Sequence, residues 1–323
     1  MKKTIGQWFL SGPFLFAAVL LCWAMWAGQV DLFGAKKTVY ETYSPYHHIR
    51  VIDQNGFRIL SFNGSLESQV SINNPLTGHF EYIEYFHMPW LWNAEIRNVL
   101  VMGLGGGSVQ RLFQHYHKEV AIETVELDPK VIEVAKTYFD ISNNESHKIT
   151  KSDGRLFLRR TGKKYDLVLM DAYSSNRYGS FIPYHLVTQE FFKIVKEHLS
   201  ENGVVAYNVI GTLKGSRAGI LGAVYKTMKS VFPQVYLFPA TKLQNVVMVA
   251  TMNPDNYDSE RVRQAASRLM RQKKSNLPGF QTRLQSFMNT PPPAAERSLI
   301  LIDDFSPVDG LLRSASFKQP RKR

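Results

Sequence analysis

Short apolar runs alternate with stretches of helical periodicity from Val99 to Thr251. The runs have the length and composition of buried strands, and the stretches between them place apolar residues three or four positions apart. This repeated β/α pattern predicts a mostly parallel sheet with helices on both faces. Strands are expected at Val99–Met102, Ala121–Val125, Lys148–Lys151, Tyr165–Asp171, Gly203–Val209, Val235–Pro239 and Val246–Thr251, and helices at Val109–His115, Asp128–Phe139, Arg155–Arg160, Thr188–His198 and Arg217–Val231.

The chain on either side of this region has a different pattern. Residues 38–96 read as a small β unit, in which Gln54-Asn55-Gly56 is a hairpin signal, followed by a helical pattern over Gly78–Leu91. After Asn253 come a basic helical pattern over Asp258–Lys274, a short strand over Leu299–Asp304 and a tail from Ser314 that is expected to be disordered. The predicted division is 1–37, an anchor and linker; 38–96, a small β-hairpin domain; 97–252, a nucleoside-binding domain; and 253–323, a basic extension.

The apolar segment Trp8–Ala27 carries no formal charge and is about 30 Å long as a helix, enough to span a bilayer once. A cleaved signal peptide is the alternative. Because no clean small-x-small cleavage site precedes Gly28, an uncleaved transmembrane anchor that contacts membrane lipid is favoured.

Composition narrows the chemistry. The only cysteine, Cys22, allows no intrachain disulfide and no cysteine-based metal site, and the nine histidines lack metal-ligand spacing, so no metal is expected. The net charge of +12 fits an anionic partner or a solvated basic surface. No nucleic-acid partner is expected.

A glycine turn and three acids predict a nucleoside site. The turn comprises Gly103, Gly105, Gly106 and Gly107 and is followed by Ser108 at a helix start, where backbone N–H groups are free to bind a ligand. Glu126 ends the next strand and can accept both ribose hydroxyls. Asp153-Gly154 and Asp171 follow later strands, so they should reach the same crevice, with Asp171 nearest the reacting centre. Alternatively, each acid caps the helix that follows it.

The motifs around these residues resemble those of the spermidine synthase (polyamine aminopropyltransferase) family. They are SPYHHI, FNGSLES, FEYIEYFHMPW, GLGGGS, VELD, SDGRLFL, YDLVLMDAYS and IPYHLVTQEFFKIVKEHLSENGVVAYN, and together they cover about residues 40–251. The ending LIDDFSPVD resembles membrane-fused relatives of that family. The resemblance implies a Rossmann-like, methyltransferase-type α/β fold behind the small β domain, and transfer of an aminopropyl group from decarboxylated S-adenosylmethionine to an amine.

Residue by residue, the resemblance implies that Glu126 binds the ribose and Asp153-Gly154 the adenine. Asp171 would accept a proton, and Tyr82 would help to position the attacking amine. The departures lie on the amine side, where His47, Ile83 and Ser174 replace polar or acidic family residues. The expected acceptor site is His47, Tyr173 and Ser174.

Ser108 replaces the family acid that follows the three glycines. A serine does not repel the carboxylate of intact S-adenosylmethionine, as an acid there would. The lost acids and the +12 charge weaken a putrescine-type acceptor, because a buried ammonium needs carboxylates.

The sequence is therefore consistent with three functions. The first is an aminopropyltransferase with a small-molecule amine or another nucleophile as acceptor. The second is a methyltransferase that uses intact S-adenosylmethionine, and the third is a non-catalytic nucleoside- or polyamine-binding domain. The expected setting is the inner or plasma membrane with the catalytic domain on the cytoplasmic side, where such donors are made, and a homodimer is possible.

Overall fold

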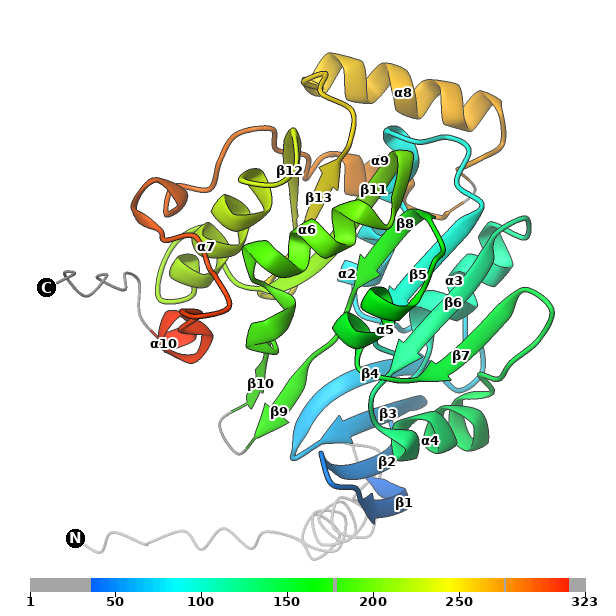
Figure 1. The fold of residues 1–323 in the computed structure, drawn as a ribbon. Coiled ribbons are helices and arrows are strands. Elements are labelled where there is room, and N and C mark those ends of the chain that lie inside the picture. Colours follow the sequence, from blue (N-terminus) through cyan, green and yellow to red (C-terminus); the bar gives the residue numbers. More distant parts are fainter. Residues whose placement is uncertain (1–35, 177–178, 276, 314–323) are drawn as a thin grey trace, which may run out of the picture.

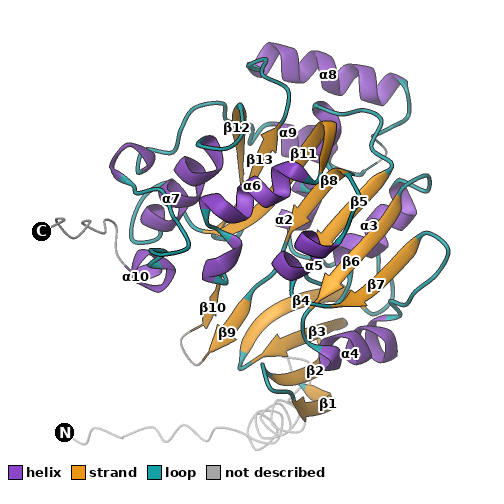
Figure 2. Cartoon of the chain, in the orientation of Figure 1, coloured by secondary structure: helices purple, strands orange, loops and turns teal. Residues whose placement is uncertain are grey.

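The computed structural model describes residues 36–176, 179–275 and 277–313. Its centre is a seven-stranded sheet in the order β12-β13-β11-β8-β5-β6-β7 (Figures 1 and 2). Strands β5, β6, β7, β8 and β11 run parallel, and β13 and β12 are antiparallel to their neighbours. The bounds are β5 Asn98–Met102, β6 Ala121–Glu126, β7 His147–Lys151, β8 Tyr165–Met170, β11 Leu199–Ile210, β12 Gln234–Pro239 and β13 Asn245–Thr251.

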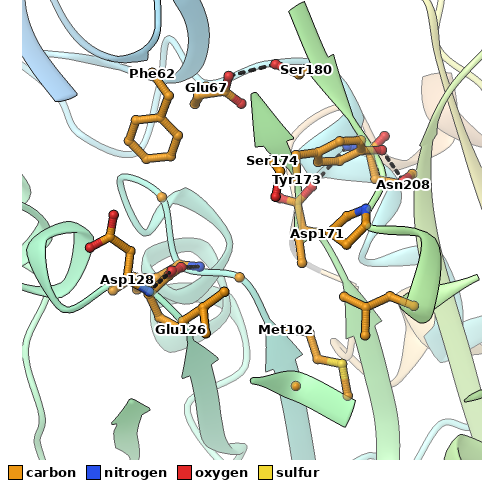
Figure 3. Close-up of a pocket in the computed structure, with 18 of the residues that line it drawn as sticks. Phe62, Glu67, Met102, Glu126, Asp128, Asp171, Tyr173, Ser174, Ser180 and Asn208 are labelled. Atoms are coloured by element: carbon orange, nitrogen blue, oxygen red, sulfur yellow. Dashed lines mark hydrogen bonds between the residues drawn. The ribbon is translucent and has the colours of Figure 1, made fainter. Parts of the chain in front are cut away.

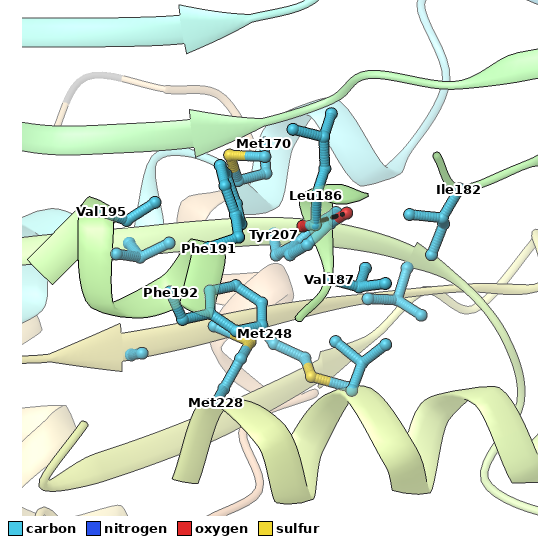
Figure 4. Packing of buried hydrophobic residues seen from close by; sticks show 14 of the residues in the cluster. Met170, Ile182, Leu186, Val187, Phe191, Phe192, Val195, Tyr207, Met228 and Met248 are labelled. Atoms are coloured by element: carbon cyan, nitrogen blue, oxygen red, sulfur yellow. Dashed lines mark hydrogen bonds between the residues drawn. The ribbon is translucent and has the colours of Figure 1, made fainter. Parts of the chain in front are cut away.

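Side chains alternate across this sheet and fill two hydrophobic cores. In β5, Leu100 and Met102 pack on one face with α5, α6, α7 and α10, while Val99 and Val101 pack on the other with α2, α3, α8 and α9. Figure 4 shows part of the first core, around Phe191, Phe192 and Tyr207. The helices are α2 Tyr82–Tyr85, α3 Ser108–Tyr116, α4 Pro129–Phe139, α5 Gly154–Arg160, α6 Gln189–Glu197, α7 Ala218–Lys229, α8 Ser259–Arg271, α9 Phe280–Leu284 and α10 Val308–Arg313, with 3₁₀ turns η1 Met88–Leu91, η2 Tyr184–Leu186 and η3 Ala295–Arg297.

A second, antiparallel sheet precedes the large one. Its strands β1 Lys37–Tyr43, β2 His48–Gln54, β3 Phe57–Phe62 and β4 Ser65–Ser71 pair in sequence order. The predicted hairpin turn is confirmed: Asn55 and Gly56 have φ of 53° and 77°, which a two-residue turn of this kind requires. Its inner face packs on α4, so the small sheet lies at the carboxyl end of β6 (Figure 1).

The Rossmann-like α/β fold with a small β unit in front of it is confirmed, but three local predictions need correction. The helical pattern over 78–91 forms only α2 and η1, since Pro89 has no N–H for a continuing helix. The apolar run at 299–304 is not a strand, because it bonds to Thr227 and Gln189 rather than to a neighbouring strand. Strand β4 and the hairpin of β9 Ser174–Asn176 and β10 Gly179–Phe181 were not predicted.

The predicted transmembrane helix, Trp8–Ala27, lies outside the described residues. Within residues 36–176, 179–275 and 277–313, no helix combines the length and the apolar composition needed to cross a bilayer. The fold class, which was expected to include such a helix, is therefore corrected to the described α/β domain and small β unit, and the described structure does not support the predicted location at the inner or plasma membrane.

Candidate functional site

A pocket of about 360 Å³ lies at the carboxyl ends of β5, β6 and β8, with β4 on its other side. After β5 the chain moves to β6 and β7, and it returns to the other side of β5 with β8. Such a reversal of strand order opens a crevice between neighbouring loops, where ligands of open α/β sheets bind. The lining includes the predicted residues His47, Tyr82, Gly103, Gly105, Glu126, Asp153, Gly154, Asp171, Tyr173 and Ser174.

The glycine turn leads the chain from β5 into α3 beneath the pocket. Gly103 has φ of 101°, and a Cβ there would collide with the carbonyl group of Asp171. Gly107, with φ of 69°, is the N-cap residue of α3, and the Gly106 N–H donates to Ser68 Oγ of β4 at 2.9 Å. Gly106, Gly107 and Ser108 do not line the pocket; Ser108 is a buried residue in the first turn of α3. Only the first half of the turn therefore faces a ligand.

Glu126 stands at the end of β6 and points into the pocket (Figure 3). Its Oε2 accepts the Leu104 N–H at 3.0 Å and its Oε1 the Asp128 N–H at 2.8 Å. These two bonds fix the carboxylate without using all of its acceptor positions. Burial raises the pKa of Glu126, although both backbone bonds oppose that rise.

Two further acids lining the pocket are helix caps. Asp153 accepts the Leu156 N–H at the start of α5, and its other oxygen lies 2.9 Å from His185 Nε2. Asp128 accepts the Lys130 N–H at the start of α4. The capping alternative is thus right for Asp153, yet the residue still lines the pocket beside Gly154. One carboxylate can cap a helix and also present an oxygen to a ligand.

Asp171 follows β8 directly and lines the pocket beside the buried Asn208. Asn208 Nδ2 donates to its Oδ1 at 3.0 Å, and the Tyr82 hydroxyl donates to its Oδ2 at 3.2 Å. Asn208 is held in turn by Asn245 at 2.9 Å. Burial raises the pKa of Asp171 to about 7, against the opposing effect of the two hydrogen bonds. A carboxyl group with a pKa near neutrality is suited to accept a proton at physiological pH.

The three predicted acceptor-site residues line the pocket in different ways. His47 stacks on Phe62 at 4.4 Å and places Nδ1 3.2 Å from Asp128, so its ring is held on the side of the pocket where β6 ends. The Tyr173 hydroxyl bonds to the backbone of Asn208 and Ile210, which leaves only its ring to contact a ligand. Ser174 begins β9.

The polar residues of the lining that sequence reasoning missed include Glu67, Asn208, Asn245 and His185. His185 and Asn208 lie within motifs of the family resemblance, IPYHL and VVAYN, which was the available signal. Glu67 also lies within one of these motifs, FNGSLES, but the strand that carries it has little apolar alternation and was not predicted.

The charge of the pocket is opposite to that of the whole chain. Its lining contains Glu67, Glu126, Asp128, Asp153 and Asp171, and none of the lining residues in the described part of the chain is a lysine or arginine. Among the described residues, no group of three or more His, Cys, Asp or Glu side chains is arranged to hold a metal ion. The arrangement can hold a cationic organic ligand and accept a proton beside it.

Comparison with known proteins gives a consistent result. Residues 79–256, more than half of the chain, match the spermine/spermidine synthase domain. The polyamine aminopropyltransferase of Vibrio vulnificus is 27% identical over 308 residues, which cover 92% of this chain and 98% of that relative.

Two solved structures share the fold. A spermidine synthase in complex with the transition-state analogue AdoDATO aligns with a TM-score of 0.58 at 20% identity, over 77% of this chain and 88% of that one. Human methyltransferase-like protein 13 in complex with SAH aligns with a TM-score of 0.51 at 25% identity, over 61% of this chain and 91% of that one.

Proposed function

The chain belongs to the spermine/spermidine synthase family, and on this premise we propose that it transfers an aminopropyl group from decarboxylated S-adenosylmethionine to an amine acceptor. The observation that carries the proposal is Asp171, a half-buried carboxyl group with a pKa of about 7, held by Tyr82 and Asn208 inside an acidic pocket. The donor carries a sulfonium and an ammonium group, so an acidic pocket suits it.

The nucleoside part of the donor would lie over the ends of β5, β6 and β7. Glu126 would accept hydrogen bonds from the ribose hydroxyls, and Asp153 with Gly154 would meet the adenine. Gly103 and Gly105 would let the backbone approach the ligand closely. This placement directs the aminopropyl chain toward Asp171.

The reaction is a direct displacement. The neutral nitrogen of the acceptor attacks the methylene carbon bonded to the sulfonium, and the carbon–sulfur bond breaks with its electrons moving to sulfur. Methylthioadenosine leaves, and the proton lost by the nitrogen passes to Asp171. Because the sulfonium charge disappears in the transition state, the protein acts mainly by positioning the reactants and by excluding water. Tyr82 holds Asp171 in place and contributes an apolar wall.

Incubation with decarboxylated S-adenosylmethionine and a panel of amines, followed by mass spectrometry, tests the proposal. Methylthioadenosine and an aminopropylated amine should form in equal amounts. Asp171→Asn should lower kcat by about 100-fold or more with donor affinity retained. The matched control is Asp304→Asn, which changes an exposed acid outside the pocket. Loss of fold and donor binding together in Asp171→Asn would instead make Asp171 structural.

A methyltransferase is the second candidate, favoured by the structural likeness to methyltransferase-like protein 13. It would use intact S-adenosylmethionine and release S-adenosylhomocysteine. Running the same assay with the intact donor separates the two reactions by product mass, since a transferred methyl group and a transferred aminopropyl group differ.

A further inference from the structure

The proposed reaction gives no task to two carboxylates of the pocket, Glu67 and Asp128, and of these Asp128 caps α4. Glu67 lies on β4, outside the seven-stranded sheet, and lines the pocket on the side of the small β sheet. Figure 3 shows it beside Ser180, across the pocket from Glu126 and Asp128. Its Oε1 accepts the Ser180 hydroxyl of β10 at 2.7 Å. This bond joins β4 to the β9–β10 hairpin that follows Asp171.

Rigid elements on both sides hold Glu67 in this position. The β3–β4 turn has Asn63 and Gly64 at φ of 50° and 92°, and the Asn63 side chain donates to the Ser175 carbonyl at 2.7 Å. One residue after Glu67, Ser68 accepts the Gly106 N–H of the glycine turn. Glu67 is therefore fixed relative to both the glycine turn and the segment after Asp171.

Glu67 forms no ion pair within the described residues, and the basic group that acts on it, His47, is paired with Asp128. Asp128 lies against His47 and Asp153 against His185, whereas no ion pair to Glu67 or Asp171 forms within the described part of the chain. A carboxylate withdrawn from water is costly unless a cation or several hydrogen bonds replace its hydration. The two substrates of the proposed reaction are both cations, so a bound substrate can supply the missing charge.

We propose that Glu67 binds a primary alkylammonium group of a substrate beside the reacting centre, and so determines which substrates the pocket accepts. This assignment rests on the proposed function for the identity of the substrates. The ammonium has two possible sources: the aminopropyl end of the donor, or the second amine of a diamine acceptor. Neither group changes its charge during the displacement, so an anion beside it stabilises binding without opposing the loss of the sulfonium charge.

Calorimetry on the full-length protein and on Glu67→Gln tests the site. Glutamine keeps an acceptor for the Ser180 hydroxyl and removes only the charge, so the fold should persist. Decarboxylated S-adenosylmethionine is compared with methylthioadenosine, which lacks the ammonium. 1,4-Diaminobutane is compared with 1-aminobutane on protein saturated with methylthioadenosine. Glu41→Gln, which changes an exposed glutamate of β1, is the matched control and should leave all four affinities unchanged.

If the donor supplies the ammonium, Glu67→Gln should weaken the binding of decarboxylated S-adenosylmethionine about tenfold or more and leave the binding of methylthioadenosine unchanged. A tenfold loss is the scale expected for losing a hydrogen bond to a charged group. If the acceptor supplies it, the same loss should appear for 1,4-diaminobutane and not for 1-aminobutane. Equal losses with and without the ammonium, or no loss for any ligand, would overturn the proposal. These measurements need no turnover, so they remain decisive if the wild-type protein forms no aminopropylated product and the proposed function itself fails.

Discussion

Asp171 should impose a pH dependence on the reaction. Burial raises its pKa to about 7, so a growing fraction of the carboxyl group is protonated, and unable to accept a proton, as the pH falls below 7. The amine acceptor also loses reactivity toward low pH, which makes the difference between two proteins the useful quantity. Below pH 7, the slope of log(kcat/KM) against pH should be about one unit steeper for the wild type than for Asp171→Asn. Parallel profiles would show that Asp171 does not carry the proton.

Asp171 should also lower the free energy of unfolding at pH values above its pKa. In the unfolded chain its carboxyl group ionises near 3.8, and in the folded protein near 7, so the folded state binds the extra proton. The stabilisation from this protonated group is complete below pH 3.8 and is lost as the pH rises through 7. Asp171→Asn should therefore raise the free energy of unfolding at pH 8, by on the order of 1–4 kcal/mol. Urea unfolding at pH 8 measures this, and a less stable variant would contradict it.

At the scale of elements, the turn between β5 and α3 depends on Gly103. A residue with a side chain would have to adopt the φ of 101° found here, and its Cβ would collide with the carbonyl of Asp171. Gly103→Ala should lower the free energy of unfolding by about 2 kcal/mol or more and abolish binding of methylthioadenosine. Gly162→Ala is the control, because a Cβ there meets no atom within 4 Å. Equal behaviour of the two variants in urea unfolding and calorimetry would show that the turn tolerates a side chain.

The junction of η1 and α3 contains a buried histidine pair. His87 Nδ1 lies 2.8 Å from His117 Nε2, and burial lowers the pKa of both, that of His117 to about 4. In the unfolded chain His117 takes up a proton near pH 6.5, whereas in the folded protein it does so only near pH 4. The free energy of unfolding therefore decreases as the pH falls from 6.5 toward 4. His117→Asn should reduce this loss by about 1.4 kcal/mol per pH unit. Urea unfolding at pH 6.5 and 5 measures the slope; an unchanged slope would mean that His117 titrates normally.

The elements also show what the sequence could predict. The strands and helices of the large sheet follow from strong apolar periodicity, and most of their bounds fall within two or three residues of the predicted ones. Strand β4 has no comparable pattern: Leu66 is exposed, and pairing with β3 holds the strand in place. Because Glu67 lies on this strand, apolar periodicity did not indicate its place in the pocket, although the residue lies within the family motif FNGSLES. The run at 299–304 shows the opposite error, since Leu301 bonds to the Gln189 backbone N–H of α6 and to the Thr227 side chain of α7 rather than to a strand.

For the molecule as a whole, net charge proved a poor guide to the site. The net charge of +12 argued against a polycationic substrate, because like charges repel. The lining of the pocket nevertheless carries five carboxylates and, among the described residues, neither lysine nor arginine. Fields of distant surface charges are screened over about 10 Å at ordinary salt, while groups inside a pocket act at contact distance. The composition therefore describes the outer surface and not the binding site.

The pocket is built by both sheets, so ligand binding should stabilise both. Ser68 of β4 bonds to the glycine turn, and Asn63 bonds to Ser175 of the hairpin after Asp171. Saturation with methylthioadenosine at about 100 times Kd should add about 2.7 kcal/mol to the free energy of unfolding. In hydrogen exchange followed by mass spectrometry, protection should rise at residues 62–71, 103–108 and 171–176, which are far apart in sequence. Helix α8, which does not line the pocket, is the internal control and should exchange as before. Protection limited to the large sheet would show that the small β sheet takes no part in binding the donor, and it would remove the structural basis for placing Glu67 against a substrate.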